Sequence, residues 1–239
     1  TQWDIVRDSA KAIEPVYNEL VRQAAQGEVL YNDDTTMRIL ELTGARAKGR
    51  VFAEETPQRK GLFTSGIVST NDGRQIALFF TGRKHAGENL AEVLARRAKD
   101  LAPPIQMCDA LSRNVPKELK TILSNCLAHG RRQFVDVAEN FQTECRYVLE
   151  ILGEVYRNDA IARERGLSPQ ERLRFHQAES GPLTEKLKAW FTQQFEDRLV
   201  EPNSGLGEAI SYMLKHWQKL TLFLRKPGAP LDNNICERA

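Results

Sequence analysis

The sequence contains no long apolar run and no recognisable export signal. No window approaches the run of about 18 apolar residues that a membrane-spanning helix needs. The first residues, Thr1-Gln2-Trp3-Asp4, lack the basic start and the apolar stretch of a signal peptide. We therefore expect a cytoplasmic enzyme or binding protein without a membrane anchor.

Disulfide and metal-binding patterns of cysteine are also missing. The four cysteines have no spacing typical of a disulfide scaffold in a chain of 239 residues, so reduced thiols are expected. Cys126 and His129 form a C-x-x-H pair that is similar to half of a zinc site. Because no second pair with suitable spacing follows, we do not expect a complete structural zinc site.

A strong net charge is absent as well. The formal charge is only +2, so the overall charge does not indicate a nucleic-acid-binding protein. Basic residues are instead concentrated in three short segments: Arg46, Lys48, Arg50, Arg59 and Lys60, then Arg83, Lys84 and His85, and finally Arg131 and Arg132. Such segments can neutralise phosphates locally, or they can be solvated loops and helix faces. Charge alone leaves both interpretations open.

The first half of the chain has the order of an α/β domain. Apolar residues at helical spacing predict a helix over roughly the first 27 residues, and a segment rich in β-branched residues follows over 29–42. Asn71-Asp72-Gly73 between two apolar segments is a strong signal for a β-hairpin. The further predicted elements are a helix over 87–101, a strand over 105–108, a short helix from Pro116 and a strand over 122–128. This order predicts a mixed sheet flanked by helices.

The second half is predicted to be helical throughout. Its apolar period predicts one long helix over 131–156, and Ser168-Pro169-Gln170-Glu171 is a capping box that starts another. Two more helices are predicted over 183–195 and 208–224. We therefore divide the chain into a helical lead-in (1–27), an α/β core (28–130), a helical insertion (131–228) and a return to the core (229–239).

Three acidic residues occupy places where a sheet and a covering helix could bring them together. Asp33 lies in the β-branched segment, Asp109 follows a predicted strand, and Glu237 stands near the last residue. Metal-dependent phosphoryl transfer needs carboxylate oxygens gathered from separate parts of a chain. Each acid also has an ordinary explanation, because Asp33 could form a turn and Asp109 could cap the next turn. Glu237 could complete a capping box with Asn234.

Five segments, in order, resemble the insertion-sequence sixty-six family of bacterial transposases. The last nine residues, LDNNICERA, are similar to its D-N-N-x-x-E-R-A signature. Asn32-Asp33-Asp34-Thr35 resembles the D-E-T segment that holds the first catalytic Asp, and Gln106-Met107-Cys108-Asp109 resembles the segment that holds the second. Residues 126–134 are similar to C-W-A-H-x-R-R-K-F, and residues 166–172 to R-G-L-S-P-E-E-R. The resemblance spans essentially the whole chain.

This resemblance implies a ribonuclease-H-like mixed sheet flanked by helices, with an all-helical insertion before the last catalytic helix. It implies a DDE-type transposase in which Asp33, Asp109 and Glu237 hold two Mg²⁺ or Mn²⁺ ions for DNA cleavage and strand transfer. The implied partners are transposon ends and target DNA, bound by a homo-oligomer in the bacterial cytoplasm near the nucleoid. Terminal-repeat recognition is expected to lie outside these residues.

The resemblance also implies phosphate contacts by residues near the acidic site. The candidates are His129, Arg131 and Arg132, together with Arg83 and Lys84. For the first three, the alternative is an ordinary helix start with exposed arginines and a capping histidine.

The sequence departs from the family pattern at four positions without removing a presumed metal ligand. Asp34 stands in place of Glu, Thr36 of Pro, Ala110 of Gly and Leu127 of Trp. Two other functions therefore stay open beside an active transposase. One is a metal-dependent nuclease that cuts DNA without joining it, and the other is an inactive DNA-binding relative.

Overall fold

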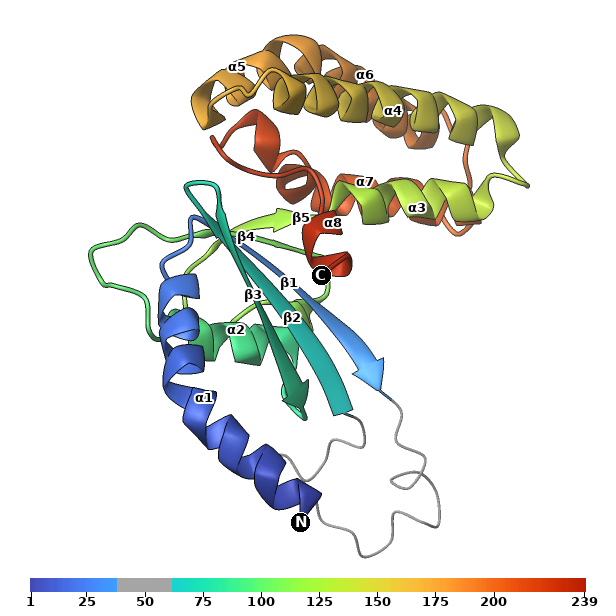
Figure 1. Cartoon of the computed structure of the whole chain (residues 1–239). Coiled ribbons are helices and arrows are strands. Elements are labelled where there is room, and N and C mark those ends of the chain that lie inside the picture. Colours follow the sequence, from blue (N-terminus) through green and yellow to red (C-terminus); the bar gives the residue numbers. More distant parts are fainter. Residues whose placement is uncertain (38–61) are drawn as a thin grey trace, which may run out of the picture. The chain divides into compact units, whose positions relative to one another are not determined.

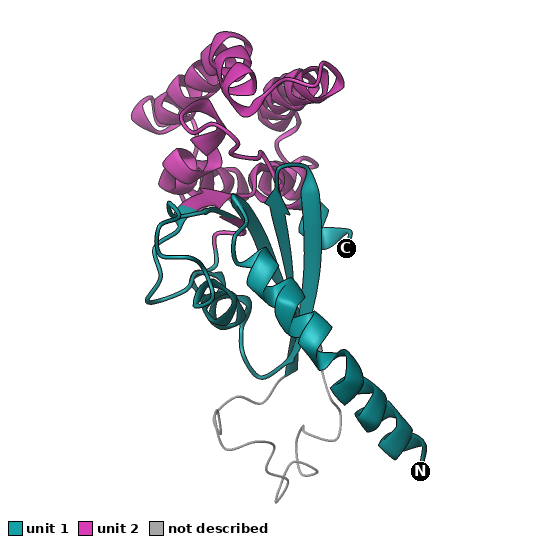
Figure 2. Cartoon of the chain, turned by 60° about the vertical axis from the view of Figure 1, so that its left-hand side comes forward, with its two compact units in different colours: residues 1–106, 111–122, 234–239 teal, residues 107–110, 123–233 magenta. Residues whose placement is uncertain are grey.

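The computed structural model describes residues 1–37 and 62–239, which form two compact units (Figures 1 and 2). Unit 1 comprises Thr1–Gln106, Leu111–Ile122 and Asn234–Ala239, and unit 2 comprises Met107–Ala110 and Leu123–Asn233. Within the described ranges, no helix has the length and apolar content needed to cross a bilayer. The first predicted basic segment lies outside the described residues; it contains Arg46, Lys48, Arg50, Arg59 and Lys60.

A five-stranded sheet has the order β3-β2-β1-β4-β5. The strands are β1 (Val29–Met37), β2 (Leu62–Asn71), β3 (Arg74–Gly82), β4 (Ile105–Cys108) and β5 (Ile122–Asn125). The first three are antiparallel neighbours. The backbone N–H of Ile122 donates to Pro104, and that of Cys126 donates to Cys108. This constant offset makes β4 and β5 parallel, so the sheet is mixed, as the sequence predicts.

Two helices of unit 1 pack on the antiparallel strands. Helix α1 (Gln2–Ala24) contacts β2 and β3, and α2 (Ala86–Leu94) contacts β1 and β2. The hydrophobic core between them contains Val21, Ala24, Leu30, Ile67, Leu78, Leu90 and Val93. Alternate residues of each strand point to this core, which leaves the residues between them on the opposite face of the sheet.

The predicted hairpin is confirmed. Asp72 and Gly73 form the two-residue loop between β2 and β3, with φ values of 48° and 76°. Aspartate tolerates this left-handed region better than most residues and glycine enters it without steric cost, so the dipeptide suits a tight hairpin turn.

Two other predictions for unit 1 are wrong. The helix predicted over 87–101 ends at Leu94, after which N–H groups bond three residues back. Arg97 then donates to the carbonyls of Ala25, Gly27 and Ala102, which ties the turn to the end of α1. Pro116 starts no helix; the segment instead holds a short 3₁₀ helix, η3 (Ser112–Asn114).

Unit 2 is helical beyond β5. Its helices are α3 (Leu127–Val137), α4 (Gln142–Glu164), α5 (Pro169–Glu179), α6 (Gly181–Glu196) and α7 (Gly205–Leu220), followed by the 3₁₀ helix η4 (Leu222–Leu224). The Ser168 capping box at the start of α5 is confirmed. The single helix predicted over 131–156 is wrong, because Phe141 has the non-helical angles φ −133° and ψ 57°. Helix α3 packs on α7, whereas α4 packs on α5 and α6, so the break redirects the chain although the apolar period continues.

A buried ionic cluster joins α4 to α5 in unit 2. The carboxylate of Asp159 accepts from Arg172 at 2.6 Å and lies 3.2 Å from Nε2 of His176, whose Nδ1 lies 3.0 Å from the Ser180 hydroxyl. Arg163 lies 3.3 Å from the second oxygen of Asp159. Burial raises the pKa of Asp159, but the hydrogen bond from His176 and the positive charge of Arg172 outweigh it and lower the pKa. The cluster therefore holds a charged carboxylate inside the helical unit.

Candidate functional site

Asp33 lies inside β1 rather than in a turn. It pairs with Gly66 on β2, which in turn pairs with Phe79 on β3. Residues that face each other across neighbouring strands point to the same side of a sheet. Asp33 therefore shares a face with Gly66 and Phe79, while Asn32 and Asp34 point to the opposite face, where α2 packs.

The last helix, α8 (Asn234–Glu237), covers the face that carries Asp33. It contacts β1 and β2, and its Cys236 is buried with the thiol directed toward the Gly66 carbonyl at 3.5 Å. A Cβ atom at Gly66 would lie 3.2 Å from Sγ of Cys236, closer than ordinary van der Waals contact. Glycine at this strand position therefore makes room for α8 beside Asp33.

The pKa of the Cys236 thiol reflects negative charge on this face of unit 1. Burial, together with the negative charges of Asp33 and Glu237, raises this pKa to about 12, while a hydrogen bond with the Asp33 backbone acts in the opposite direction. The thiol therefore stays protonated at neutral pH. Asp33 and Glu237 come from opposite ends of the sequence, and the charges of both act on the same thiol.

The alternative explanation for Glu237, a capping box with Asn234, stays a prediction. Asn234 is the first residue of the short helix α8. Glu237 is exposed and Asp33 is partly buried, so both carboxylates can reach solvent from this face.

Asp109 follows β4 directly and belongs to unit 2. Its carbonyl accepts from the Asn125 side-chain amide at 3.2 Å, which fixes the end of β4 against the end of β5. Within the same unit, burial and the negative charge of Asp109 together raise the pKa of Tyr212 on α7 to about 12. Sequence reasoning did not identify Tyr212 as a neighbour of Asp109, because the two are far apart along the chain.

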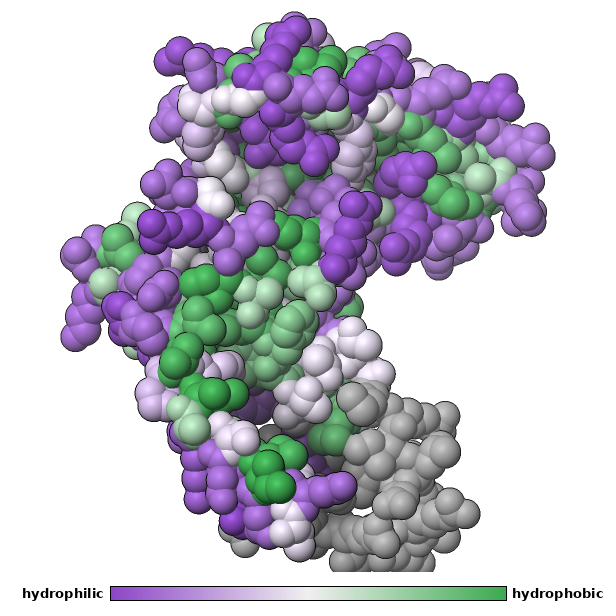
Figure 3. Space-filling view, in the orientation of Figure 1, coloured by the Kyte–Doolittle hydropathy of each residue, from purple (hydrophilic) through white to green (hydrophobic). Residues whose placement is uncertain are grey.

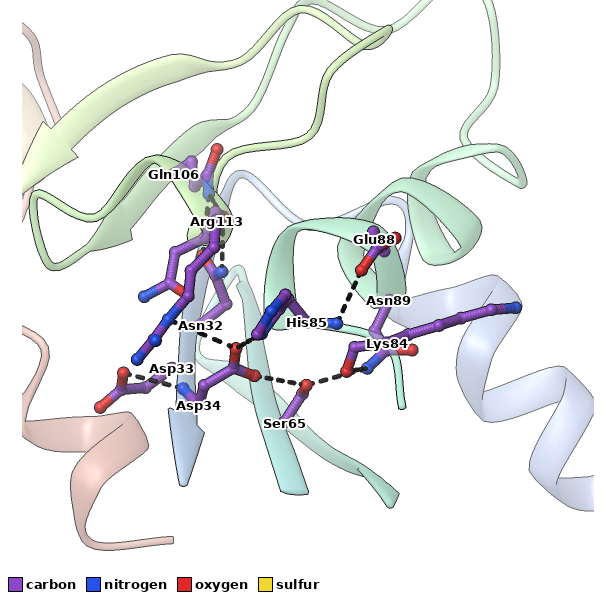
Figure 4. Close-up of polar contacts among 11 residues, drawn as sticks. Asn32, Asp33, Asp34, Ser65, Lys84, His85, Glu88, Asn89, Gln106 and Arg113 are labelled. Atoms are coloured by element: carbon purple, nitrogen blue, oxygen red, sulfur yellow. Dashed lines mark hydrogen bonds and ion pairs between the residues drawn. The ribbon is translucent and has the colours of Figure 1, made fainter. Parts of the chain in front are cut away.

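A second polar network on the α2 side holds β1 beside Asp33, and sequence reasoning missed it (Figure 4). Asp34, whose side chain is fully buried, accepts from the Ser65 hydroxyl at 2.7 Å and lies 3.0 Å from Nδ1 of His85. The Asn89 amide donates to Ser65 at 2.8 Å. The backbone N–H of Asp34 donates to a carboxylate oxygen of Asp33 at 2.8 Å. These contacts, called here the Asp34 network, therefore fix the strand that presents Asp33.

Buried amides extend the same support toward β4. Asn32 donates to the Asn114 carbonyl at 2.8 Å, and Gln106 donates to both Asn32 and Asn114 at 2.9 and 2.7 Å. Thr121 then donates to Gln106 at 2.8 Å. Buried amides with satisfied hydrogen bonds specify one register, because any slip would leave several polar groups without partners.

The basic residues chosen from the sequence differ in their surroundings. Arg131 and Arg132 are exposed on α3, and His129 is the third residue of that helix. The cap residue is Cys126, so the interpretation of His129 as the helix cap is wrong. In unit 1, Arg83 and Lys84 lie between β3 and α2, and Lys84 pairs with Glu92 at 2.5 Å. This ion pair offsets part of the charge that Lys84 would offer to a phosphate.

A groove of 890 Å³ lies beside the Asp34 network in unit 1. His85, Arg113 and Lys117 line it together with Glu88 and Glu118. Side chains of both charges line the groove, so it does not present the uniformly positive surface that attracts a DNA backbone. We therefore place no DNA contact there.

The donor atoms around Asp33 suit a hard divalent cation. Two carboxylates supply oxygen ligands of the kind that Mg²⁺ and Mn²⁺ prefer. Burial raises the pKa of the neighbouring Cys236 thiol, which is protonated at neutral pH. Burial also raises the pKa of Cys126 in unit 2, whose sulfur accepts from the Asn233 backbone at 3.3 Å. All four cysteines are buried and none forms a disulfide.

Comparison with known proteins gives the family. The family model described as "Transposase IS66 family" matches residues 1–239. Uncharacterized protein y4jD of Sinorhizobium fredii (strain NBRC 101917 / NGR234) is 29% identical over 241 residues, covering 95% of this chain and 43% of that protein. Uncharacterized protein y4hP of the same strain is 28% identical over 251 residues, covering 100% of this chain and 44% of that protein. The chain thus spans less than half the length of these relatives, and no solved structure matches it.

Proposed function

The chain belongs to the transposase IS66 family, and we propose that it is the catalytic part of a DDE-type enzyme that cuts and rejoins DNA. The observation that carries this proposal is the packing of α8, which holds Glu237, on β1, the strand that holds Asp33. These acids are separated by almost the whole sequence, and only the packing of α8 on β1 and β2 brings them together. A glycine position on β2 and the buried Cys236 thiol serve this packing.

A ribonuclease-H-like fold is part of the proposal. Three antiparallel strands are followed in the sheet by two further strands that run parallel to each other, with a helix between β3 and β4. This order is the one expected of such a core. The helices of unit 2 then occupy the place in sequence between β5 and α8, as a helical insertion would.

Asp109 is proposed as the third carboxylate. It follows β4, and β4 is the neighbour of β1 in the sheet order. Two Mg²⁺ or Mn²⁺ ions bound by Asp33, Asp109 and Glu237 would activate the attacking oxygen and stabilise the leaving oxygen of a phosphodiester. Water would be the nucleophile for cleavage, and a DNA 3′-hydroxyl would be the nucleophile for strand transfer.

The protein's own contribution to this chemistry is positioning. The Asp34 network keeps β1 rigid on one side of the sheet, and α8 covers the other side. Preorganised ligands of this kind avoid the cost of gathering charged groups during each reaction. Arg131 and Arg132, which are exposed, are the proposed phosphate contacts, together with His129.

The experiment that tests the proposal is Mn²⁺ binding by calorimetry, followed by a DNA cleavage and joining assay. We expect binding in the wild-type chain and its loss in Asp33→Asn, Asp109→Asn and Glu237→Gln, each with an unchanged circular dichroism spectrum. Asp72→Asn is the matched control, because it removes an exposed carboxylate from the hairpin turn and asparagine tolerates the positive φ there. Wild-type affinity in Asp33→Asn would refute the carboxylate site.

The same assay distinguishes a transposase from the alternative enzyme, a metal-dependent nuclease. Cleavage with joining of a 3′-hydroxyl end identifies a transposase, whereas cleavage without joining identifies a nuclease. A chain that binds DNA but neither binds Mn²⁺ nor cuts would be an inactive DNA-binding relative.

A further inference from the structure

Most of α1 lacks support from the rest of unit 1 among the described residues. Of positions 1 to 20, every residue except Asp4 is exposed. The core begins only with Val21 and Ala24, and the hydrogen bonds from Arg96 reach α1 at Asn18. Figure 2 shows this part of the helix extending beyond the sheet of unit 1.

A helix in this situation is not expected to be stable alone in water. Most of the stability of a helix in a protein comes from packing of one of its faces rather than from intrinsic propensity. Pro15 inside α1 removes one backbone hydrogen bond as well. The exposed part of α1 therefore needs a partner that covers one of its faces.

Six apolar residues of α1 define that face. They recur with alternating spacings of three and four, which is the pattern that packs two helices along a common seam. Two other exposed apolar residues of α1, Ile5 and Val16, lie outside this series. The seam consists of Trp3, Val6, Ala10, Ile13, Tyr17 and Leu20. Trp3 is 72% exposed and Ile13 is 64% exposed. Figure 3 shows hydrophobic surface along this part of the chain, and Pro15 falls on the side of the helix away from the seam.

The charges beside the seam select a second copy of this chain in the opposite orientation. Arg7 and Glu14 lie on the same edge of the seam, seven residues apart, with opposite signs. When one of two identical helices is reversed, the same edges of both seams come together. Arg7 of one copy then meets Glu14 of the other, and the two-fold symmetry repeats the pair. In a parallel pair, the same residues would face the uncharged Gln2 and Ser9.

The hydrophobic residues fit the reversed arrangement as well. Trp3 of one copy lies against Leu20 of the other, and Val6 lies against Tyr17. Ala10 and Ile13 meet near the two-fold axis, where the small alanine lets the helices approach closely. Large residues thus face each other at both ends of the seam. The exposed ion pairs of Arg7 with Asp4 and Asp8 are weak competitors, because solvent screens them.

We propose that two copies of this chain associate through antiparallel pairing of their α1 helices along this seam. The pairing would bury the exposed apolar residues and place two Arg7–Glu14 ion pairs on its edges. It goes beyond the proposed catalytic function and does not depend on it, since self-association is measured without DNA or metal.

Sedimentation equilibrium of the purified chain over a range of concentrations tests this proposal. We expect a monomer–dimer equilibrium for the wild type and a monomer for Ile13→Asp, which places a charge in the seam. Arg7→Glu and Glu14→Arg should each weaken dimerisation about tenfold, because two attractive pairs become repulsive. The double variant Arg7→Glu/Glu14→Arg should restore the wild-type dissociation constant.

Lys11→Glu is the matched control, since it reverses a charge on α1 outside the seam and should leave the dissociation constant unchanged. Circular dichroism of each variant at high concentration checks that unit 1 and unit 2 stay folded. A wild type that remains monomeric at all concentrations overturns the proposal and indicates another occupant of the seam. The proposal is also overturned if the wild type dimerises but Arg7→Glu and Glu14→Arg both have the wild-type dissociation constant.

Discussion

Replacing Gly66 by valine tests whether the packing of α8 on the sheet positions Glu237. A Cβ atom at this residue already lies 3.2 Å from Sγ of Cys236. The two methyl groups of valine extend a further ~1.5 Å from Cβ, the length of one carbon–carbon bond. A methyl group that points toward the sulfur overlaps it unless α8 moves outward by about 1 Å or more.

The expected cost in folding stability is small, because two effects oppose each other. Loss of the buried Cys236 contact costs roughly 1–2 kcal/mol. Replacement of a strand glycine by a β-branched residue returns about 0.5–1 kcal/mol. The free energy of unfolding should therefore change by about 1 kcal/mol. In contrast, a misplacement of a reacting group by about 1 Å costs roughly 100-fold in rate.

The assay compares Mn²⁺ affinity and DNA cleavage rate with the urea unfolding midpoint of the same samples. We expect Gly66→Val to lose most cleavage while it unfolds close to the wild type. Gly66→Ala should lose less, because its Cβ displaces the sulfur by only a few tenths of an ångström. Gly82→Val is the matched control, since nothing lies within 4 Å of a Cβ there. Full cleavage by a folded Gly66→Val protein would refute the role given to α8.

Three further predictions concern the packing and the polar networks. Gly87→Ala should lower the free energy of unfolding by about 2–3 kcal/mol in urea titrations, because its Cβ would lie 2.6 Å from a backbone oxygen, whereas Gly82→Ala should be neutral. Ser65→Ala should cost about 1–2 kcal/mol and slow cleavage, because buried Asp34 loses a donor; cleavage at the wild-type rate would contradict this. For Asp159, whose pKa is lowered in the folded protein, the stabilisation is complete above the unfolded value of about 3.9 and is lost as pH falls toward the native value. The advantage of the wild type over Asp159→Asn in thermal unfolding should therefore be largest near neutral pH and shrink in acid, and a constant difference would count against it.

Local signals in the sequence are sufficient to predict several secondary-structure elements. The Asp72-Gly73 loop defines its hairpin because few dipeptides adopt that backbone conformation. The Ser168 capping box defines the start of α5 for a similar reason, since the contacts involved lie within four residues. The order of the strands also follows from the sequence, and it predicts a mixed sheet.

Element ends depended on contacts from elsewhere in the chain. Helix α2 stops at Leu94 because the following turn is held by Arg97 against the end of α1. The break near Phe141 is hidden in the sequence, because the apolar period of α3 continues into α4 while the two helices pack on different partners. The apolar period indicates which face of a helix is buried, but it does not indicate which other element that face packs against.

For the candidate site too, one part follows from the sequence and another part only from the tertiary structure. The sequence alone, through its segments and their resemblance, determined which acids to consider: Asp33, Asp109 and Glu237. Only the tertiary structure decided that Glu237 comes to Asp33, because this requires α8 to pack at Gly66, a glycine that no local pattern marks. The pairing of Asp34 with His85 was likewise settled in three dimensions, since the sequence places His85 in a basic cluster 51 residues away. Hydrogen bonds and packing contacts between segments that are far apart in sequence depend on the path of the chain in three dimensions. Local sequence patterns do not specify that path, so these contacts are seen only in the tertiary structure.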